Sequence, residues 1–404
     1  MFTRRKMIQA TFGSAALITA GTAAPPFLWG ASCQASQKSD EKILVVLQLS
    51  GGNDGLNTVI PYANDEYYRN RFTLAVEKSQ VAKIDDEIGW HPALNGFARL
   101  LDDGQLAVVQ GVGYPNPNRS HFESMDLWHT AHQNTKEFPR GWLGRCVDEH
   151  LSGELPAIHY GGEKQPLALT TRTKPVASIQ SLDQFRLRLG EHRPLSLGIA
   201  KNLEQQREHR HELLGFIHEN ASMAMTTSQK LESILSTGDA MKTYPETTLG
   251  KKLAAVAQLI ESGLPTRIYY VTHDGFDTHA NQAAAHAALL QQLGDATQAF
   301  HEDLKNKGHA ERTLLMTFSE FGRRVRENAS RGTDHGTAAP LFLAGGRLKA
   351  GPLNQHPDLL DLEQGDLKHN IDYRSVYATV LEDWLGVEST EILGQPFKKL
   401  NLFI

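Results

Sequence analysis

The chain has 404 residues, of which 40% are hydrophobic and 22% are charged, with a formal net charge of −5 at pH 7. This composition is typical of a globular protein with a large core, built as one large α/β domain with an inserted cap or as two closely packed domains. The negative charge argues against a nucleic-acid-binding surface. There are two cysteines, Cys33 and Cys146, and loss of the N-terminal segment would leave no intramolecular disulfide. We expect Cys146 to be a small buried apolar residue and not a nucleophile.

The first 24 residues, MFTRRKMIQATFGSAALITAGTAA, are typical of an export signal. Residues 3–6 contain the paired arginines of a twin-arginine signal, and residues 10–24 form an apolar run too short for a membrane span. We therefore expect a signal peptide and linker over residues 1–36, followed by the main domain. The predicted location is periplasmic or secreted, with the twin-arginine translocation machinery as a partner and no stable membrane span after cleavage. An uncleaved signal anchor, or lipoprotein cleavage at Cys33, remains an alternative.

The run ILVVLQL over residues 43–49 is aliphatic without strict alternation, which predicts a strand buried on both faces of a parallel sheet. It ends in SGGNDG, where the glycines allow a sharp turn and a close approach to a ligand. Asp54 would lie at the carboxyl end of this strand, where open α/β sheets bind ligands, and we expect it to hold a metal ion. The alternative is that Asp54 only stabilises the turn.

A second buried strand is expected over residues 106–112, followed by a Pro/Asn-rich segment and then by Ser120. Residues 122–131 have helical spacing, so Ser120 lies at or near a helix N-terminus. Two roles remain open for this serine. It could be an N-cap in a capping box with Glu123, or a nucleophile whose hydroxyl is bound by metal at the positive end of the helix.

The remaining sequence alternates between helical and strand patterns. We expect helices over 91–101, 138–147, 248–262, 281–305 and 373–385, and strands over 157–160, 167–170, 267–272, 313–319 and 340–345. Residues 65–90 are polar and irregular, which predicts turns and short helices. The charged segment over about 178–245 predicts a helical insertion or cap that shapes specificity.

Residues of metal-ligand type follow or precede these later strands. They are His273, Asp274, Asp277, His279, Glu320, Asp334 and His335. Because the loops at the carboxyl ends of parallel strands lie at one edge of the sheet, we expect them to join Asp54 in a site for one or two divalent cations. The mixture of nitrogen and oxygen ligands favours Zn or Mn over Mg. The alternative is a set of structural His and Asp residues in loop turns.

These residues lie in motifs that resemble a known family. The sequence resembles the bacterial domain-of-unknown-function family 1501 in its export signal and in LQLSGGNDGLNTVIP, GVGYPNPNRSHFE, GWLGR, THDGFDTHANQ, TFSEFGRRVREN and GTDHGTAAPLFLAGG. That family is similar to the alkaline phosphatase/sulfatase superfamily. The resemblance implies an α/β fold, with a doubly wound, mostly parallel sheet and helices on both faces, over residues 37–404. It also implies a bimetallic centre and a Ser or Thr nucleophile.

The resemblance also implies roles for individual residues. Asp54 matches the first-strand ligand, Ser120 the nucleophile, Asp277 and His279 the ligands of the other metal, Glu320 the Asp of an Asp-His pair, and His335 the late histidine. Phe321 stands in place of the paired histidine, so one ligand is lost. Asp334-His335 could instead be the pair itself, out of its usual order.

The leading hypothesis is an exported metal-dependent hydrolase of phosphate or sulfate esters, in which a metal-bound Ser120 attacks the phosphorus or sulfur. Its partner would be a small anionic ester, and the oligomeric state stays open. Arg119 or Arg323 could bind the anion, or could form only surface salt bridges. The alternatives are a non-catalytic exported binding protein on the same fold, which Phe321 favours, and a phosphoryl or sulfuryl transferase.

Overall fold

The computed structural model describes residues 41–134, 139–153, 155–174, 176–181 and 243–404. The predicted signal peptide and most of the predicted helical insertion lie outside these residues. Within the described ranges, no helix combines the length and the apolar character needed to cross a membrane.

The fold is organised around a nine-stranded sheet with the order β11-β5-β10-β9-β1-β8-β6-β7, in which β14 also pairs with β5. Its strands are β1 (Ile43–Leu49), β5 (Leu106–Gly113), β6 (Ala157–Tyr160), β7 (Ala177–Ile179), β8 (Ile268–His273), β9 (Thr313–Phe318), β10 (Ala339–Gly345), β11 (Gly351–Pro352) and β14 (Ile371–Asp372). Strand β10 is antiparallel to both of its neighbours, and the other pairings of this sheet are parallel. The predicted mostly parallel α/β sheet is therefore confirmed.

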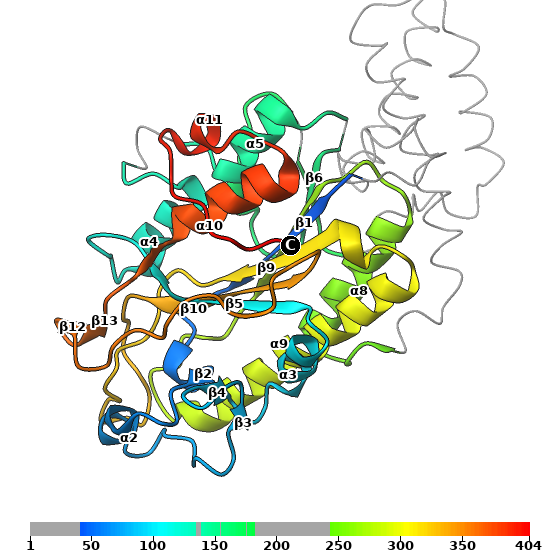
Figure 1. Cartoon of the computed structure of the whole chain (residues 1–404). Helices are drawn as coiled ribbons and strands as arrows, with labels where there is room; N and C mark the ends of the chain where they lie inside the picture. The colour runs from blue at the N-terminus through cyan, green and yellow to red at the C-terminus, as the bar shows by residue number, and fades with distance from the viewer. Residues whose placement is uncertain (1–40, 135–138, 154, 175, 182–242) are drawn as a thin grey trace, which may run out of the picture.

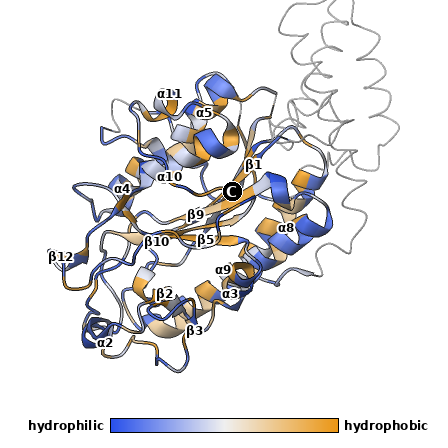
Figure 2. Ribbon diagram, viewed as in Figure 1, coloured by the Kyte–Doolittle hydropathy of each residue, from blue (hydrophilic) through white to orange (hydrophobic). Residues whose placement is uncertain are grey.

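Strand β1 lies at the centre of the sheet, between β8 and β9. Val45 and Leu47 point into the hydrophobic cluster on one face, and Leu44 and Val46 point into the cluster on the other. Both faces of β1 are therefore apolar, which explains why its sequence does not alternate. Figure 2 shows hydrophobic residues along the central strands of the sheet.

Helices cover both faces of the sheet (Figure 1). One layer consists of α3 (Asn95–Asp102), α8 (Thr248–Glu261) and α9 (Gln282–Asn306). The other consists of α4 (His121–Thr130), α5 (Trp142–His150), α10 (Tyr373–Thr379), the π-helical turn η7 (Val380–Leu385) and α11 (Ser389–Leu393). Helices α3 and α9 approach through their backbones, since a Cβ on Gly96 would lie 2.1 Å from the carbonyl oxygen of Gly294.

Smaller elements surround this core. They are α2 (Asp65–Asn70), the sheet of β2 (Val59–Ile60), β4 (Gly89–Trp90) and β3 (Ala82–Lys83), the pair β12 (Leu362–Glu363) and β13 (Asp366–Leu367), and the 3-10 turns η2 (Gly55–Asn57), η3 (Leu167–Leu169) and η6 (Ala310–Arg312). The strand predicted over 167–170 is wrong, because this short apolar run forms η3 and buries Leu169 between helices. The helix predicted from residue 91 begins at Asn95.

The direction of the strands determines which loops meet. Strands β1, β5, β8 and β9 run the same way, so their carboxyl ends lie at one edge of the sheet. Since β10 runs the opposite way, its amino end lies at that edge too. Residues that follow β5, β8 and β9 are thereby brought close to residues that precede β10.

Candidate metal centre

Three histidines and one aspartate converge at this edge of the sheet. They are His121 at the start of α4, Asp277 and His279 after β8, and His335 before β10, and we call them the histidine cluster. His121, Asp277 and His335 each offer a ligand atom within 4.8 Å of the others. Around the Asp277 carboxylate, the Nε2 atoms of His335 and His279 lie 3.1 Å from Oδ1, and Nε2 of His121 lies 3.5 Å from Oδ2.

The outward nitrogen of each histidine is held by an oxygen atom. Nδ1 of His121 lies 2.8 Å from Oε1 of Glu320, Nδ1 of His279 lies 3.3 Å from Oδ1 of Asp334, and Nδ1 of His335 lies 2.8 Å from the carbonyl oxygen of Arg119. Such outer partners fix the tautomer and orientation of metal-binding histidines. All three Nε2 atoms are consequently directed at Asp277.

The partners also limit where the protons lie. The carbonyl oxygen of Arg119 at Nδ1 and the Asp277 carboxylate at Nε2 both accept hydrogen bonds, so a neutral His335 can donate to one of them at a time. A metal ion bound at Nε2 would leave the proton on Nδ1, where the carbonyl oxygen holds it. The same reasoning applies to His279, whose Nδ1 faces a carboxylate. The two Nε2 atoms lie 2.9 Å apart. Two lone pairs at this distance repel each other unless a proton or a cation lies near both.

Asp277 is ionised at neutral pH. Burial raises the pKa of its carboxyl, but the hydrogen bonds from Arg323 and His335 outweigh this effect and lower the pKa to about 2. Its side chain is 47% exposed, so the carboxylate is accessible from solvent.

Glu320 supports the cluster from beneath. Its Oε1 accepts a 2.8 Å hydrogen bond from the backbone N–H of Gly51 as well as facing His121, and its side chain is buried. The hydrogen bond between Nδ1 of His121 and Oε1 of Glu320 raises the pKa of His121. Gly51 has φ +117°, and a Cβ there would lie 2.4 Å from the backbone nitrogen of Asp277, so only glycine fits this turn. Glu320 is thus an outer partner of His121, and its carboxylate takes no place in the histidine cluster.

The donor set of the cluster fits a divalent transition-metal ion. Three imidazole nitrogens and one carboxylate oxygen make up a four-ligand set of the kind that Zn²⁺ takes, and the oxygen-held Nδ1 atoms complete its usual surroundings. Among the described residues, His121, Asp277 and His335 are the one group whose ligand atoms all lie within 4.8 Å of one another, which accounts for one ion. His279 lies outside that group, but its Nε2 is 3.1 Å from Asp277 and 2.9 Å from Nε2 of His335, and Asp334 is its outer partner.

The structure does not bring Asp54 into this cluster. Both of its carboxylate oxygens accept hydrogen bonds from Arg71, at 2.5 and 2.9 Å, and one also accepts from Gln282. Burial raises the pKa of Asp54, but the Arg71 guanidinium overcomes this effect and lowers it. Arg71 also binds the carbonyl oxygens of Arg324 and Val325. The prediction that Asp54 holds a metal is therefore corrected: it forms a buried ion pair that fixes the loop after β9.

Two other predicted residues also lie apart from the cluster. His273 is the last residue of β8 and is buried, with its Nε2 3.3 Å from the carbonyl oxygen of Leu289. Asp274 is exposed. Phe321, which occupies the place of an expected histidine, is buried, with its ring centroid 4.9 Å from that of His121 and 4.6 Å from that of His335.

Both candidate anion-binding arginines already have partners. Arg323 is buried and donates to the carbonyl oxygens of Gly51, Gly52, Phe276 and Thr333 and to the carboxylate of Asp277. Arg119 donates from Nε to Oδ2 of Asp366, a buried residue of β13, at 2.8 Å. Arg323 is therefore a structural arginine, and neither of the two is a simple surface salt-bridge partner.

Ser120 is the N-cap residue of α4 and is exposed. Its side chain makes no capping hydrogen bond, and Glu123 instead accepts from the side chain of Asn118. The capping box is therefore wrong, although the position at the helix start is right. Ser120 directly precedes His121, a cluster residue that the sequence analysis did not single out. His121 could have been predicted from its position between Ser120, a candidate nucleophile, and the helix predicted over residues 122–131.

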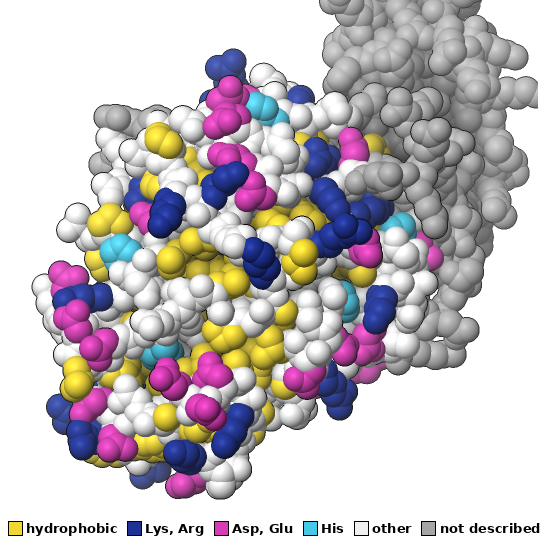
Figure 3. Space-filling model, viewed as in Figure 1, with side chains coloured by type: hydrophobic (Ala, Val, Ile, Leu, Met, Phe, Trp, Pro, Cys, Tyr) yellow, Lys and Arg dark blue, Asp and Glu magenta, His cyan; other side chains and the backbone are white. Residues whose placement is uncertain are grey.

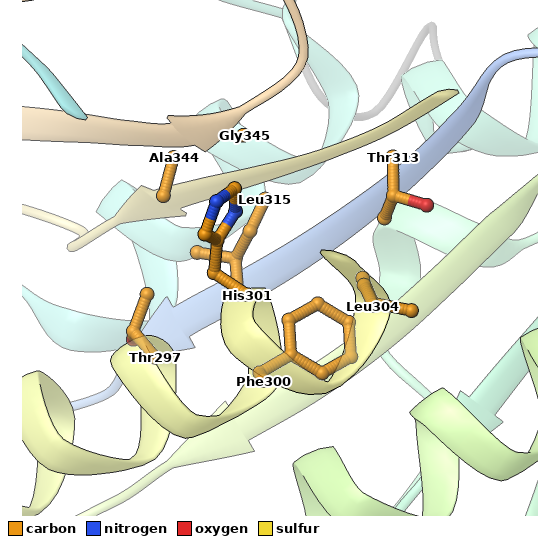
Figure 4. Close-up of a pocket in the computed structure, with 8 residues that line it drawn as sticks. All are labelled: Thr297, Phe300, His301, Leu304, Thr313, Leu315, Ala344 and Gly345. Carbon is orange, nitrogen blue, oxygen red and sulfur yellow. The ribbon is translucent and has the colours of Figure 1, made fainter. Parts of the chain in front are cut away.

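A small cavity lies at the opposite edge of the sheet, beside the start of β9 and the end of β10 (Figure 4). It is lined by Thr297, Phe300, His301, Leu304, Thr313, Leu315, Ala344 and Gly345. The hydroxyls of Thr297 and Thr313 have no hydrogen-bond partner among the described residues. This cavity is separate from the histidine cluster.

The part of the chain that the structure describes holds no second group of three or more potential metal ligands within 4.8 Å of one another. Cys146 is a free, buried cysteine, and burial raises the pKa of its thiol to about 12, as expected for an unreactive core residue. On the face viewed in Figure 3, basic and acidic side chains are interspersed.

Comparisons with known proteins identify a family and several similar folds. The family described as "Protein of unknown function (DUF1501)" matches residues 41–394, and no curated protein matches the sequence. The structure is similar to the C-terminal periplasmic domain of EcEptC from Escherichia coli in complex with Zn (9% identity, 78% of this chain and 76% of that chain, TM-score 0.37). It is also similar to the PsFucS1 sulfatase from Pseudoalteromonas sp. (12% identity, 88% of this chain and 68% of that chain, TM-score 0.37). A third similar structure is a protein in the alkaline phosphatase superfamily from Vibrio parahaemolyticus (8% identity, 91% of this chain and 71% of that chain, TM-score 0.36). Likenesses at these TM-scores carry no argument about activity.

Proposed function

The chain belongs to the family described as "Protein of unknown function (DUF1501)", and we propose that it is an exported metal-dependent hydrolase of phosphate or sulfate esters. One observation carries this proposal: three histidine Nε2 atoms converge on the Asp277 carboxylate while each Nδ1 is held by an oxygen. A divalent ion held by these four residues, zinc before manganese, would supply positive charge where negative charge develops on the ester oxygens.

Ser120 is the proposed nucleophile. Its exposed hydroxyl precedes the first turn of the ten-residue helix α4, whose N-terminus favours negative charge. The oxygen of Ser120 would form a bond to phosphorus or sulfur as the bond to the leaving alcohol breaks, and the alcohol would leave with a proton. Water would then cleave the ester formed on Ser120 and release phosphate or sulfate.

The other residues of the site have supporting roles in this proposal. Glu320 orients His121, Asp334 orients His279, and the backbone of Arg119 orients His335. Arg323 holds the carboxylate of Asp277 ionised and in place. Export is inferred from Arg4-Arg5 and the apolar run that follows.

A non-catalytic binding protein is the second candidate, because Phe321 supplies a ring where the resemblance expects a ligand. The test is hydrolysis of p-nitrophenyl phosphate, bis(p-nitrophenyl) phosphate and p-nitrophenyl sulfate by zinc-loaded and chelator-treated protein. We expect turnover of at least one ester by the loaded protein only, and a loss of about 100-fold or more in Ser120→Ala.

Ser152→Ala is the matched control, because Ser152 is an exposed loop serine that precedes the amino end of β6, at the opposite edge of the sheet from the histidine cluster. It should leave the rate unchanged. Full activity of a folded Ser120→Ala protein would contradict the assigned nucleophile. Metal binding without turnover of any ester would favour the binding protein.

A further inference from the structure

The histidine cluster is surrounded by acidic side chains. Asp277 and Asp334 are 47% and 57% exposed, and Glu320 lies buried behind His121. Together these three carboxylates balance the charge of Arg323 and of one divalent ion. A site of this composition would have little net positive charge left for a substrate.

The arginines next to the cluster residues are held by the protein itself. Arg323 has all three of its guanidinium nitrogens bonded to carbonyl or carboxylate oxygens. Arg119 is bound to Asp366, and Nε of Arg324 lies 3.8 Å from the same carboxylate. Asp366 is fully buried on β13, so these two partly exposed arginines are drawn toward a fixed negative charge.

We propose that the site selects esters with a single negative charge, namely phosphodiesters and sulfate monoesters, over dianionic phosphate monoesters. This inference rests on the proposed function and adds the charge of the substrate to it. The second charge of a phosphate monoester would need a cation of its own, and Asp366 keeps Arg119 from serving as one. Asp366 is thus a specificity-determining residue that acts through Arg119.

The first test measures binding and not turnover. Calorimetry on zinc-loaded protein at pH 8.5 compares phenylphosphonate, a dianion, with methyl phenylphosphonate, a monoanion of nearly the same shape. We expect a Kd at least about tenfold lower for the monoanion. Equal or tighter binding of the dianion would overturn the selectivity and leave the proposed hydrolase standing. Absence of binding by either compound would overturn both.

The rates provide a control for the added methyl group. p-Nitrophenyl sulfate is a monoanion that, like p-nitrophenyl phosphate, has one organic arm, so the ratio of their kcat/KM values reports charge without a change in size. We expect the sulfate ester to be preferred at pH 8.5. A preference for the phosphate monoester would contradict the proposal.

The second test removes the charge of Asp366, which holds the Arg119 side chain. Asp366→Asn should tighten binding of phenylphosphonate and bring the two Kd values to within about threefold of each other. Asp361→Asn is the matched control, because Asp361 pairs with Lys368 on the exposed surface nearby, and it should leave the ratio unchanged. An unchanged ratio in a folded Asp366→Asn protein would remove Asp366 from the explanation.

If Asp366→Asn does not fold, as shown by the absence of a cooperative unfolding transition, Arg119→Gln tests the same ion pair from its other side. Because Arg119 is committed to Asp366, its loss should change the Kd of the monoanion by less than about twofold. A loss of more than tenfold would show that Arg119 already contacts the anion, and would overturn the proposal.

Discussion

The orientation of individual imidazole rings is the feature on which the site depends. A histidine in a loop is uninformative by itself, but a histidine whose Nδ1 is bound to a carbonyl or carboxylate oxygen presents its Nε2 lone pair in a fixed direction. His121, His279 and His335 share this arrangement, and their Nε2 atoms face one carboxylate. The oxygen atoms behind the rings are therefore as informative as the ligands.

Glu320→Gln tests the role of these outer oxygens. The amide can still accept a hydrogen bond from His121 but lacks the charge, so we expect the Kd for zinc to rise about 10- to 100-fold with little loss of thermal stability. Glu391→Gln is the control, because Glu391 also pairs with a histidine, His150, that is not part of the histidine cluster. Equal zinc affinity of the Glu320→Gln and native proteins would contradict the assigned role.

Asp54→Ala tests the buried ion pair. Arg71 would keep its charge in a buried site without a carboxylate, and we expect the free energy of unfolding in urea to fall by about 3–5 kcal/mol. Asp274→Ala, at an exposed aspartate, should change it by less than about 0.5 kcal/mol. Unchanged stability of Asp54→Ala together with loss of bound metal would return Asp54 to the metal site.

The residues that were predicted wrongly share a physical cause. A Gly/Asp turn after a strand indicates that Asp54 lies near the edge of the sheet, but not which way its side chain points. The direction of the Asp54 side chain is set by its ion pair with Arg71, the residue that follows α2. The sequence pattern around Asp54 does not indicate this pairing. His273 was misplaced for a similar reason, since it is still part of β8 and so lies in the core.

Among the secondary-structure elements, the buried strands were predicted most accurately. The expected bounds 43–49 agree with β1, those of β9 differ by one residue at one end, and those of β8 are shifted by one residue at both ends. A strand that is covered on both faces has a continuous apolar run that ends sharply at its loops. A short apolar run such as 167–170 does not distinguish a strand from a 3-10 turn, because either can bury the same residues.

Asp148 connects helix α5 to the segment over residues 172–174, and the contribution of this connection to stability should depend on pH. Its carboxylate accepts hydrogen bonds from the backbone N–H groups of Arg172, Thr173 and Lys174. Burial raises the pKa of Asp148, but these hydrogen bonds lower it to about 2 from the ordinary 3.8. Its stabilising contribution is therefore complete above pH 3.8 and is lost as the pH falls toward 2.

We expect Asp148→Ala to lower the free energy of unfolding by about 2 kcal/mol at pH 6, and by much less near pH 2.5. Urea unfolding at the two pH values measures this difference. Asp358→Ala, which removes an exposed loop carboxylate, provides the control. A deficit in Asp148→Ala that stays constant between the two pH values would contradict the linkage.

At the scale of the whole molecule, the reversed direction of β10 makes the site possible. Parallel strands β5, β8 and β9 deliver His121, Asp277, His279 and Glu320 to one edge, and the antiparallel strand β10 places His335 there through its amino end. The sequence indicated a mostly parallel sheet and a cluster of ligands at one edge. The position of β10 between β5 and β9 is set by pairing between distant segments, which a local pattern does not encode.

Whether the histidine cluster binds a metal ion is tested by the zinc content of the purified protein after equilibration with zinc and removal of excess metal, measured by inductively coupled plasma mass spectrometry. We predict one zinc ion per chain in the native protein and in Asp54→Asn, and less than about 0.2 per chain in folded His121→Ala and His335→Ala proteins. No bound zinc in the native protein, or one zinc ion retained by both histidine variants, would contradict this prediction.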